Sequence, residues 1–193
     1  MTDLHVGKRF FAAANWAAEL HAATGTQSPS VAQVLGVASL VLGDGGTNRE
    51  AIAGMIVDAA RGVELMPREV RHHVGKKTAR LVTACTEALA DSERLDAEPD
   101  PSVVRVCAAV TVRDVQELLR DVRRHGSVAF ARHDEPPNRI LERYRALVAV
   151  FRRRLGRVSA LIPELRSAVA ELERDSELET AIAAWRVSHV DAA

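Results

Sequence analysis

Aromatic side chains are scarce in this chain of 193 residues, where Phe, Trp and Tyr together make up 4% of the sequence. Apolar residues nevertheless account for 47%, so Ala, Val and Leu must fill the interior. The length is sufficient for one domain with a sizeable buried core. We therefore expect a single domain over residues 1–193.

Cysteine and net charge are also low. Cys85 and Cys107 do not have the spacing of a metal site, and we expect both to be reduced core residues. Lys plus Arg equals Asp plus Glu at 26 each, which gives no general attraction to nucleic acid or anionic membranes. No apolar run approaches the roughly 18 residues of a membrane span, and the N-terminus lacks the pattern of a signal peptide. The predicted location is the cytoplasm, with no nucleic acid or membrane partner.

Strand-like alternation is absent, and apolar residues recur at helical spacing along nearly the whole chain. Thr47 and Glu50 form a capping-box pattern before a helix expected over 48–60. Further helices are expected over 31–42, 76–89, 102–124 and 138–155, with Gly75 breaking a short helix that starts at Pro67. The acidic segment 90–101 is predicted to be a loop inside the domain. The fold class is therefore all-α.

Two apolar stripes suggest how the ends of the chain pack. The first helix carries Phe10, Phe11, Ala14, Ala17, Ala18 and His21. A long last helix, expected over 158–185, carries Leu161, Leu165, Val169, Leu172, Leu178 and Ile182. The C-terminal region 138–190 is expected to pack on the body of the domain. Alternatively, the apolar stripe of the last helix contacts a second copy of the chain and forms a homo-oligomer.

The sequences Gly-Val-Ala-Ser-Leu at residues 36–40 and Gly-Met-Ile-Val-Asp at 54–58 carry a family resemblance. The stretch that they enclose resembles the centre of the HD-domain metal-dependent phosphohydrolases, nearest the hydrolase half of the RelA/SpoT-type guanosine polyphosphate enzymes. The resemblance covers most of the chain and implies an HD-domain-like helical bundle with a long C-terminal helix. In that family, a His-Asp pair closes the stretch and holds a divalent metal.

The resemblance also implies that most metal ligands are missing here. Val57 occupies the histidine of the His-Asp pair, Gln33 the first histidine, and Val110 the final aspartate, so that only Asp58 remains. One carboxylate does not make a metal site, which requires several oxygen or imidazole donors. We therefore expect no metal and no other cofactor, and no metal-activated water to cleave a phosphate ester.

Charged residues near Asp58 suggest another kind of site. Arg61 falls on one of the family's acidic positions and lies three residues after Asp58, close enough on a helix to pair with it. Arg113, at a histidine position of the family's last motif, is a second cation, and Asp114 follows it. An Arg61 side chain that points to solvent is the alternative.

The nucleotide-gripping loop of the family is only partly present. His21 matches the histidine that opens this loop, whereas the Gln, Arg and Lys that follow it are absent and the loop is about three residues shorter. A structural histidine is the alternative for His21. The predicted ligand-binding residues are His21, Gln33, Asp58, Arg61, Arg113 and Asp114.

Three functions are compatible with this sequence. The first is a metal-free pseudo-hydrolase that binds a small ligand, of nucleotide or phosphate type, or a protein partner. The second is a metal-independent reaction in which Asp58, its pKa raised by apolar neighbours, acts as the catalytic acid or base. The third is an active metal-dependent phosphohydrolase, if the register of the resemblance is wrong.

Overall fold

The computed structural model describes residues 7–23, 30–133 and 135–190, with side chains throughout except at 132, 157 and 177–190. Within these ranges the chain is helical and contains no strand, which confirms the predicted all-α fold. The helices are α1 (Lys8–Ala23), α2 (Val31–Gly43), α3 (Asn48–Ala59), α4 (Pro67–Ala90), α5 (Ser92–Ala97), α6 (Pro101–His125), α7 (Pro137–Leu155) and α8 (Leu161–Val190), with 3-10 turns at Gly126–Arg132 and Gly156–Val158. No helix of the described residues is both long and apolar enough to cross a membrane.

Helix ends follow the local sequence signals. The predicted capping box of α3 is confirmed, because the backbone N–H of Thr47 donates to Glu50 Oε2 at 2.6 Å and that of Glu50 donates to Thr47 Oγ1 at 3.3 Å. Gly75 interrupts α4 as predicted, with φ 79°, a backbone angle that favours glycine. The loop predicted over 90–101 is wrong in its middle, where Ser92–Ala97 form α5. Asp91 caps that short helix by accepting hydrogen bonds from the backbone N–H groups of Glu93 and Arg94. This N-cap is a helix signal that competes with the loop-like composition of the segment.

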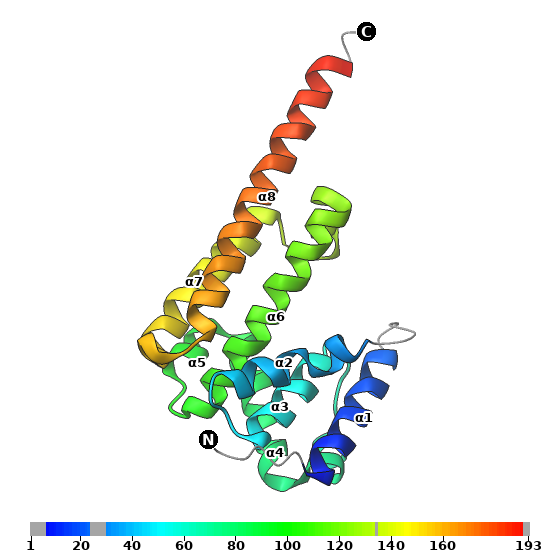
Figure 1. Ribbon diagram of the computed structural model, residues 1–193, viewed down its shortest axis with the longest axis vertical. Helices are drawn as coiled ribbons and strands as arrows, with labels where there is room; N and C mark the ends of the chain where they lie inside the picture. Colours follow the sequence, from blue (N-terminus) through cyan, green and yellow to red (C-terminus); the bar gives the residue numbers. More distant parts are fainter. Residues whose placement is uncertain (1–6, 24–29, 134, 191–193) are drawn as a thin grey trace.

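Two central helices organise the molecule. In Figure 1, α6 runs through the middle, with α1–α4 gathered around one end and α7 and α8 beside it. Every residue of α3 from Glu50 to Ala59 is buried. Gly54 allows α2 to approach closely, since a Cβ there would lie 2.7 Å from Val37 Cγ1. The buried core extends from Phe10 in α1 to Leu172 in α8.

The first helix is rotated from its predicted register. Its buried face comprises Phe10, Ala13, Trp16, Ala17 and Leu20. Phe11 is 61% exposed, so the predicted stripe through it is wrong. Trp16 stacks on His73 of α4, with ring centroids 4.2 Å apart. Because Phe10 and Phe11 are adjacent, the sequence pattern fits either of two overlapping helical stripes. His73, the stacking partner of Trp16, is distant in sequence and could not be predicted from the local pattern.

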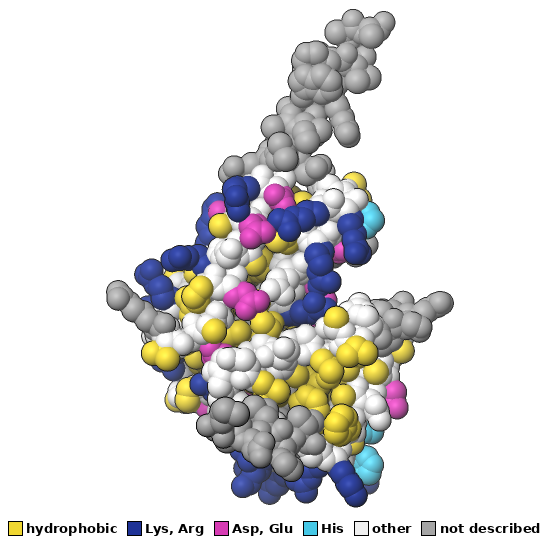
Figure 2. Space-filling model, in the orientation of Figure 1, with side chains coloured by type: hydrophobic (Ala, Val, Ile, Leu, Met, Phe, Trp, Pro, Cys, Tyr) yellow, Lys and Arg dark blue, Asp and Glu magenta, His cyan; other side chains and the backbone are white. Residues whose placement is uncertain are grey.

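The last helix lies along α6 and runs past its end (Figure 1). Leu161, Leu165, Val169 and Leu172 are buried, which confirms core packing for that part of the stripe; Leu178 and Ile182 lie outside the described side chains. Arg123 of α6 pairs with Glu171 and Asp175 of α8, each at 2.8 Å. Figure 2 shows basic and acidic side chains interspersed over this part of the surface.

A buried charge network fixes the start of α8 to the body. Arg105 of α6 contacts Asp44 Oδ2 at 3.1 Å and Glu50 Oε1 at 2.6 Å. Asp44 also accepts hydrogen bonds from the Ser159 hydroxyl at 2.8 Å and the backbone N–H of Ala160 at 2.7 Å. One guanidinium therefore ties α6 to α3 and to the turn after α2, and Asp44 of that turn holds the chain just before α8.

Candidate functional site

A cavity of about 800 Å³ opens where α3 ends, between α4, α6 and α7. Much of its wall is aliphatic and comes from Val57, Val63, Leu65, Val70, Val82 and Leu147. Tyr144 of α7 contributes an aromatic ring. The volume lies within the range of small-molecule pockets, which is roughly 300–1,000 Å³.

A cluster of three charged residues lies at this cavity. Arg61, directly after α3, has its Nε 3.7 Å from Asp58 Oδ1, so the predicted pairing is confirmed. The same guanidinium forms an ion pair with Asp114 of α6. Asp58 is 7% exposed, whereas the Arg61 side chain keeps 43% of its surface accessible. Arg61 and Asp114 line the cavity, while Asp58 lies behind Arg61.

Burial changes the protonation of these groups. Desolvation raises the pKa of Asp58 to about 7 against the pull of Arg61, and the nearby carboxylates Asp114 and Glu117 raise it further. Desolvation likewise raises the pKa of Asp114, although Arg61 opposes the change. Burial and then the Asp114 carboxylate raise the pKa of Tyr144 to about 12. At neutral pH the Tyr144 hydroxyl is therefore protonated and able to donate a hydrogen bond.

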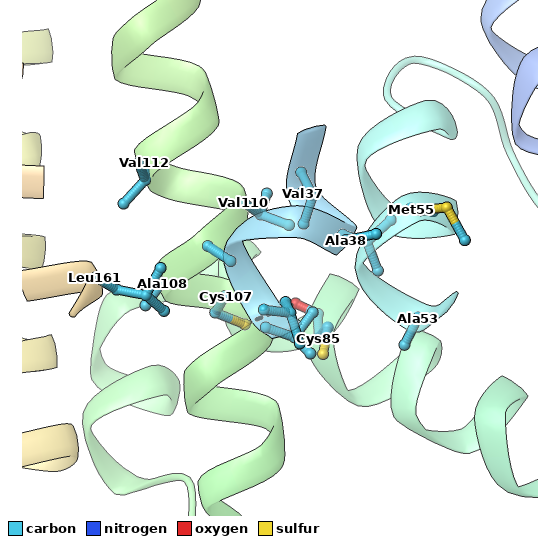
Figure 3. Close-up of a cluster of buried hydrophobic side chains, with 14 of the residues drawn as sticks. Val37, Ala38, Ala53, Met55, Cys85, Cys107, Ala108, Val110, Val112 and Leu161 are labelled. Atoms are coloured by element: carbon cyan, nitrogen blue, oxygen red, sulfur yellow. Dashed lines mark hydrogen bonds between the residues drawn. The ribbon is translucent and has the colours of Figure 1, made fainter. Parts of the chain in front are cut away.

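The positions that hold metal in the related phosphohydrolases do not offer a donor set here. Val57 lines the cavity, and Val110 is fully buried in the core shown in Figure 3, where Val37 of α2 and Cys107 of α6 also lie. The Gln33 side-chain oxygen accepts the backbone N–H of Ser30 at 2.7 Å and so caps α2. Among the described residues, no group of three His, Cys, Asp or Glu could hold a metal ion. The residues present do not fit the family's metal.

Arg113 and His21 lie close enough to Asp58 and Arg61 to influence their charges, although they belong to other contacts. Arg113 is 6% exposed and its Nη2 lies 2.6 Å from Glu117 Oε1. Gly36 of α2 makes room for it, since a Cβ there would come within 3.0 Å of Arg113 Nε. His21 is half-buried, and desolvation lowers its pKa, with the charges of Glu117 and then Arg113 as the next largest influences. Neither residue lines the cavity.

The six predicted ligand-binding residues stand in different relations to the cavity. Arg61 and Asp114 line the cavity and Asp58 contacts Arg61, whereas Gln33 caps a helix. Sequence reasoning did not identify Tyr144 and Arg143, which line the cavity from α7. Tyr144 falls in the apolar stripe of α7, and no motif or spacing distinguishes it there from an ordinary core residue.

Comparison with known proteins identifies the region that contains this cavity. The family model described as HD domain matches residues 13–156, which is more than half of the chain. The matched span includes every cavity-lining residue, from Val57 to Leu147. No curated protein matches the sequence.

Proposed function

This chain belongs to the HD-domain family, and we propose that it binds a small molecule in the cavity beside Arg61 without metal-dependent hydrolysis. We also propose that it derives from the RelA/SpoT-type branch and has lost the metal ligands of that branch. The observation that carries the proposal is the combination of a large cavity at the end of α3 with Val57 and Val110 at ligand positions.

The donor chemistry supports the loss of the metal. Two of the expected ligand positions carry aliphatic side chains, and a third carries Gln33, whose amide oxygen already accepts a hydrogen bond at 2.7 Å. The remaining Asp58 is paired with Arg61. A divalent cation placed here would meet two carboxyls, Asp58 and Asp114, and a competing guanidinium, which is too few donors for a stable site.

The positive charge of Arg61 takes the place that a cation would have. Its guanidinium lies between a carboxyl of α3 and a carboxyl of α6, and both would otherwise be buried without a counter-charge. Because a guanidinium has several N–H donors in a plane, it can contact both carboxyls at once. We propose that Arg61 stabilises this wall of the cavity by balancing their charge.

The metal content and hydrolytic activity of the purified chain test the first half of the proposal. Elemental analysis is expected to find well below one Mn, Zn or Fe per chain. Phosphate release from guanosine nucleotides is expected to stay at background with added Mn²⁺. Stoichiometric metal, together with phosphate release that Asp58→Asn abolishes, would contradict the proposal and identify the chain as an active phosphohydrolase.

Ligand binding in the cavity tests the second half. A metabolite set screened by thermal shift should contain ligands that raise the melting temperature of the wild type. Thr83 and Thr86 line the cavity from α4 and are exposed, so Thr83→Trp is expected to fill the cavity and abolish those shifts. Lys77→Trp, exposed on the same helix and remote from the lining, is the matched control and should keep them. Shifts that survive Thr83→Trp would place binding elsewhere.

A metal-independent reaction is a second candidate, favoured by one observation. The pKa of Asp58 near 7 would let this carboxyl exchange a proton at neutral pH. Asp58 does not line the cavity, however, and Arg61 lies between the two. A substrate would therefore reach Asp114 before Asp58, and binding without turnover accounts better for the geometry.

A further inference from the structure

We infer that the cavity ligand is an aliphatic molecule with a neutral or cationic polar head, and not a nucleotide or another phosphate. This inference rests on the proposed function and specifies its ligand. The charges of the cavity wall, the helix ends that meet it and the aliphatic lining each support it.

The charged wall of the cavity is predominantly acidic. Four carboxyl side chains line it, from Glu64, Glu87, Asp114 and Glu135, against two guanidiniums, Arg61 and Arg143. Arg61 is paired with Asp114, and Arg143 has its Nε 3.8 Å from Glu135 Oε2. Each lining guanidinium already has a carboxylate from the same wall as its partner, and Glu87 is paired with Arg94, which does not line the cavity. A phosphate would have to separate such a pair and would then face the displaced carboxylate.

The helices that begin at the cavity do not supply an anion site. The first N–H groups of a helix attract phosphate when they are open to it. At α5, which Ser92 begins, the Asp91 carboxylate accepts the N–H groups of Glu93 and Arg94 at 2.9 and 3.3 Å. α4 begins with Pro67, which has no N–H to donate, and the N–H groups of Glu69 and Val70 donate to the Met66 carbonyl oxygen. The backbone therefore does not compensate for the acidic wall.

The apolar wall suits an alkyl or alicyclic body better than a nucleobase. Its side chains are mostly Val, Leu and Ala, and Tyr144 is the aromatic residue among the lining residues. Guanine recognition ordinarily uses stacking and polar contacts to the base edge, which aliphatic side chains do not provide. Next to this wall, the Tyr144 hydroxyl and the carboxylate of Glu64 can hydrogen-bond an alcohol or an ammonium group.

Isothermal titration calorimetry of the full chain at pH 7.5 tests the inference with probes of one chain length. The probes are octylamine, 1-octanol and octanoate, with GTP as the phosphate probe. Octylamine is expected to bind at least about tenfold more tightly than octanoate, a difference of about 1.4 kcal/mol. Octanol should fall between them and GTP should give no heat of binding. Thr83→Trp should abolish binding of the alkyl probes and Lys77→Trp should retain it.

The outcomes separate this inference from the proposed function. Octanoate or GTP binding as tightly as octylamine, and lost in Thr83→Trp, would overturn the ligand class while leaving a small-molecule site in the cavity. If none of the four probes binds and the metabolite screen is also empty, both the inference and the proposed function fail. Binding that Thr83→Trp leaves unchanged overturns the inference, because the probes then occupy another surface.

A charge variant provides an independent readout. Glu64→Gln removes one carboxylate from the lining while keeping its shape. The preference for octylamine over octanoate should fall by at least about threefold, while octanol affinity stays within a factor of two. An unchanged preference would show that the acidic wall does not select the ligand and would overturn the inference.

Discussion

Replacing Asp58 by Asn should remove a pH-dependent cost of folding. The Asp58 carboxyl is buried, and desolvation raises its pKa from 3.8 to about 7 in the folded chain. The folded state therefore binds this proton more tightly than the unfolded state, so protonation of Asp58 increases the free energy of unfolding. This stabilisation is fully present below about pH 4. It is lost as the pH rises towards 7. At 1.36 kcal/mol per pKa unit, the whole loss is about 4 kcal/mol.

Urea unfolding followed by circular dichroism from pH 4.5 to 8.5 measures this effect. Because Asn cannot ionise, the wild type should lose about 3 kcal/mol relative to Asp58→Asn across that range. The difference between the two curves cancels the titration of groups that the variant leaves unchanged. Its midpoint reports on Asp58 together with Asp114, to which it is electrostatically coupled. Parallel curves, or a wild type that gains stability relative to the variant as the pH rises, would refute the assigned burial of this carboxyl.

Three further substitutions test the packing around the site, each by the free energy of unfolding in urea. Arg105→Met leaves the buried Glu50 carboxylate without its cation and should cost about 3 kcal/mol; a loss below about 1 kcal/mol would contradict the network. Gly54→Ala places a Cβ 2.7 Å from an α2 side chain and should lower the free energy of unfolding by about 1–3 kcal/mol. Gly43→Ala is the control, because no atom lies within 4 Å of its Cβ, and it should change the free energy of unfolding by less than about 0.5 kcal/mol. Gly75→Ala forces φ 79° and ψ 162° on a residue with a Cβ and should cost about 1–3 kcal/mol; a stabilised variant would show that the kink relaxes.

The helices could be predicted because their signals are local. The capping pair Thr47 and Glu50 and the glycines at 75 and 126 mark helix ends through backbone hydrogen bonds and positive φ angles, which depend on a few neighbouring residues. The prediction was wrong where two local signals competed. Segment 90–101 has the prolines and acidic residues of a loop, and it also has Asp91 as a good N-cap for α5.

The site could be predicted only in part, because its members come from helices distant in sequence. Asp58 and Arg61 are three residues apart, so helical geometry predicts their contact. The ion pair of Arg61 with Asp114 depends on how α3 packs on α6, which the sequence pattern does not specify. Tyr144 comes from α7, and its hydroxyl has functional meaning only once the cavity is known.

Charge balance links the proposed loss of the metal to the predicted pH dependence. Asp58 and Asp114 are both buried, and Arg61 is the cation that contacts both of them. If both carboxyls were ionised, the cluster would carry a net negative charge in a poorly solvated place, which is costly. One proton held by the pair removes that charge, and because burial raises the pKa of both Asp58 and Asp114, that proton belongs to the coupled pair. Under the function proposed above, a guanidinium and a proton together balance this charge in place of a metal ion. Because the guanidinium is committed to the two carboxyls, it leaves little positive charge for a ligand, and for this reason we expect the cavity to prefer a neutral or cationic head.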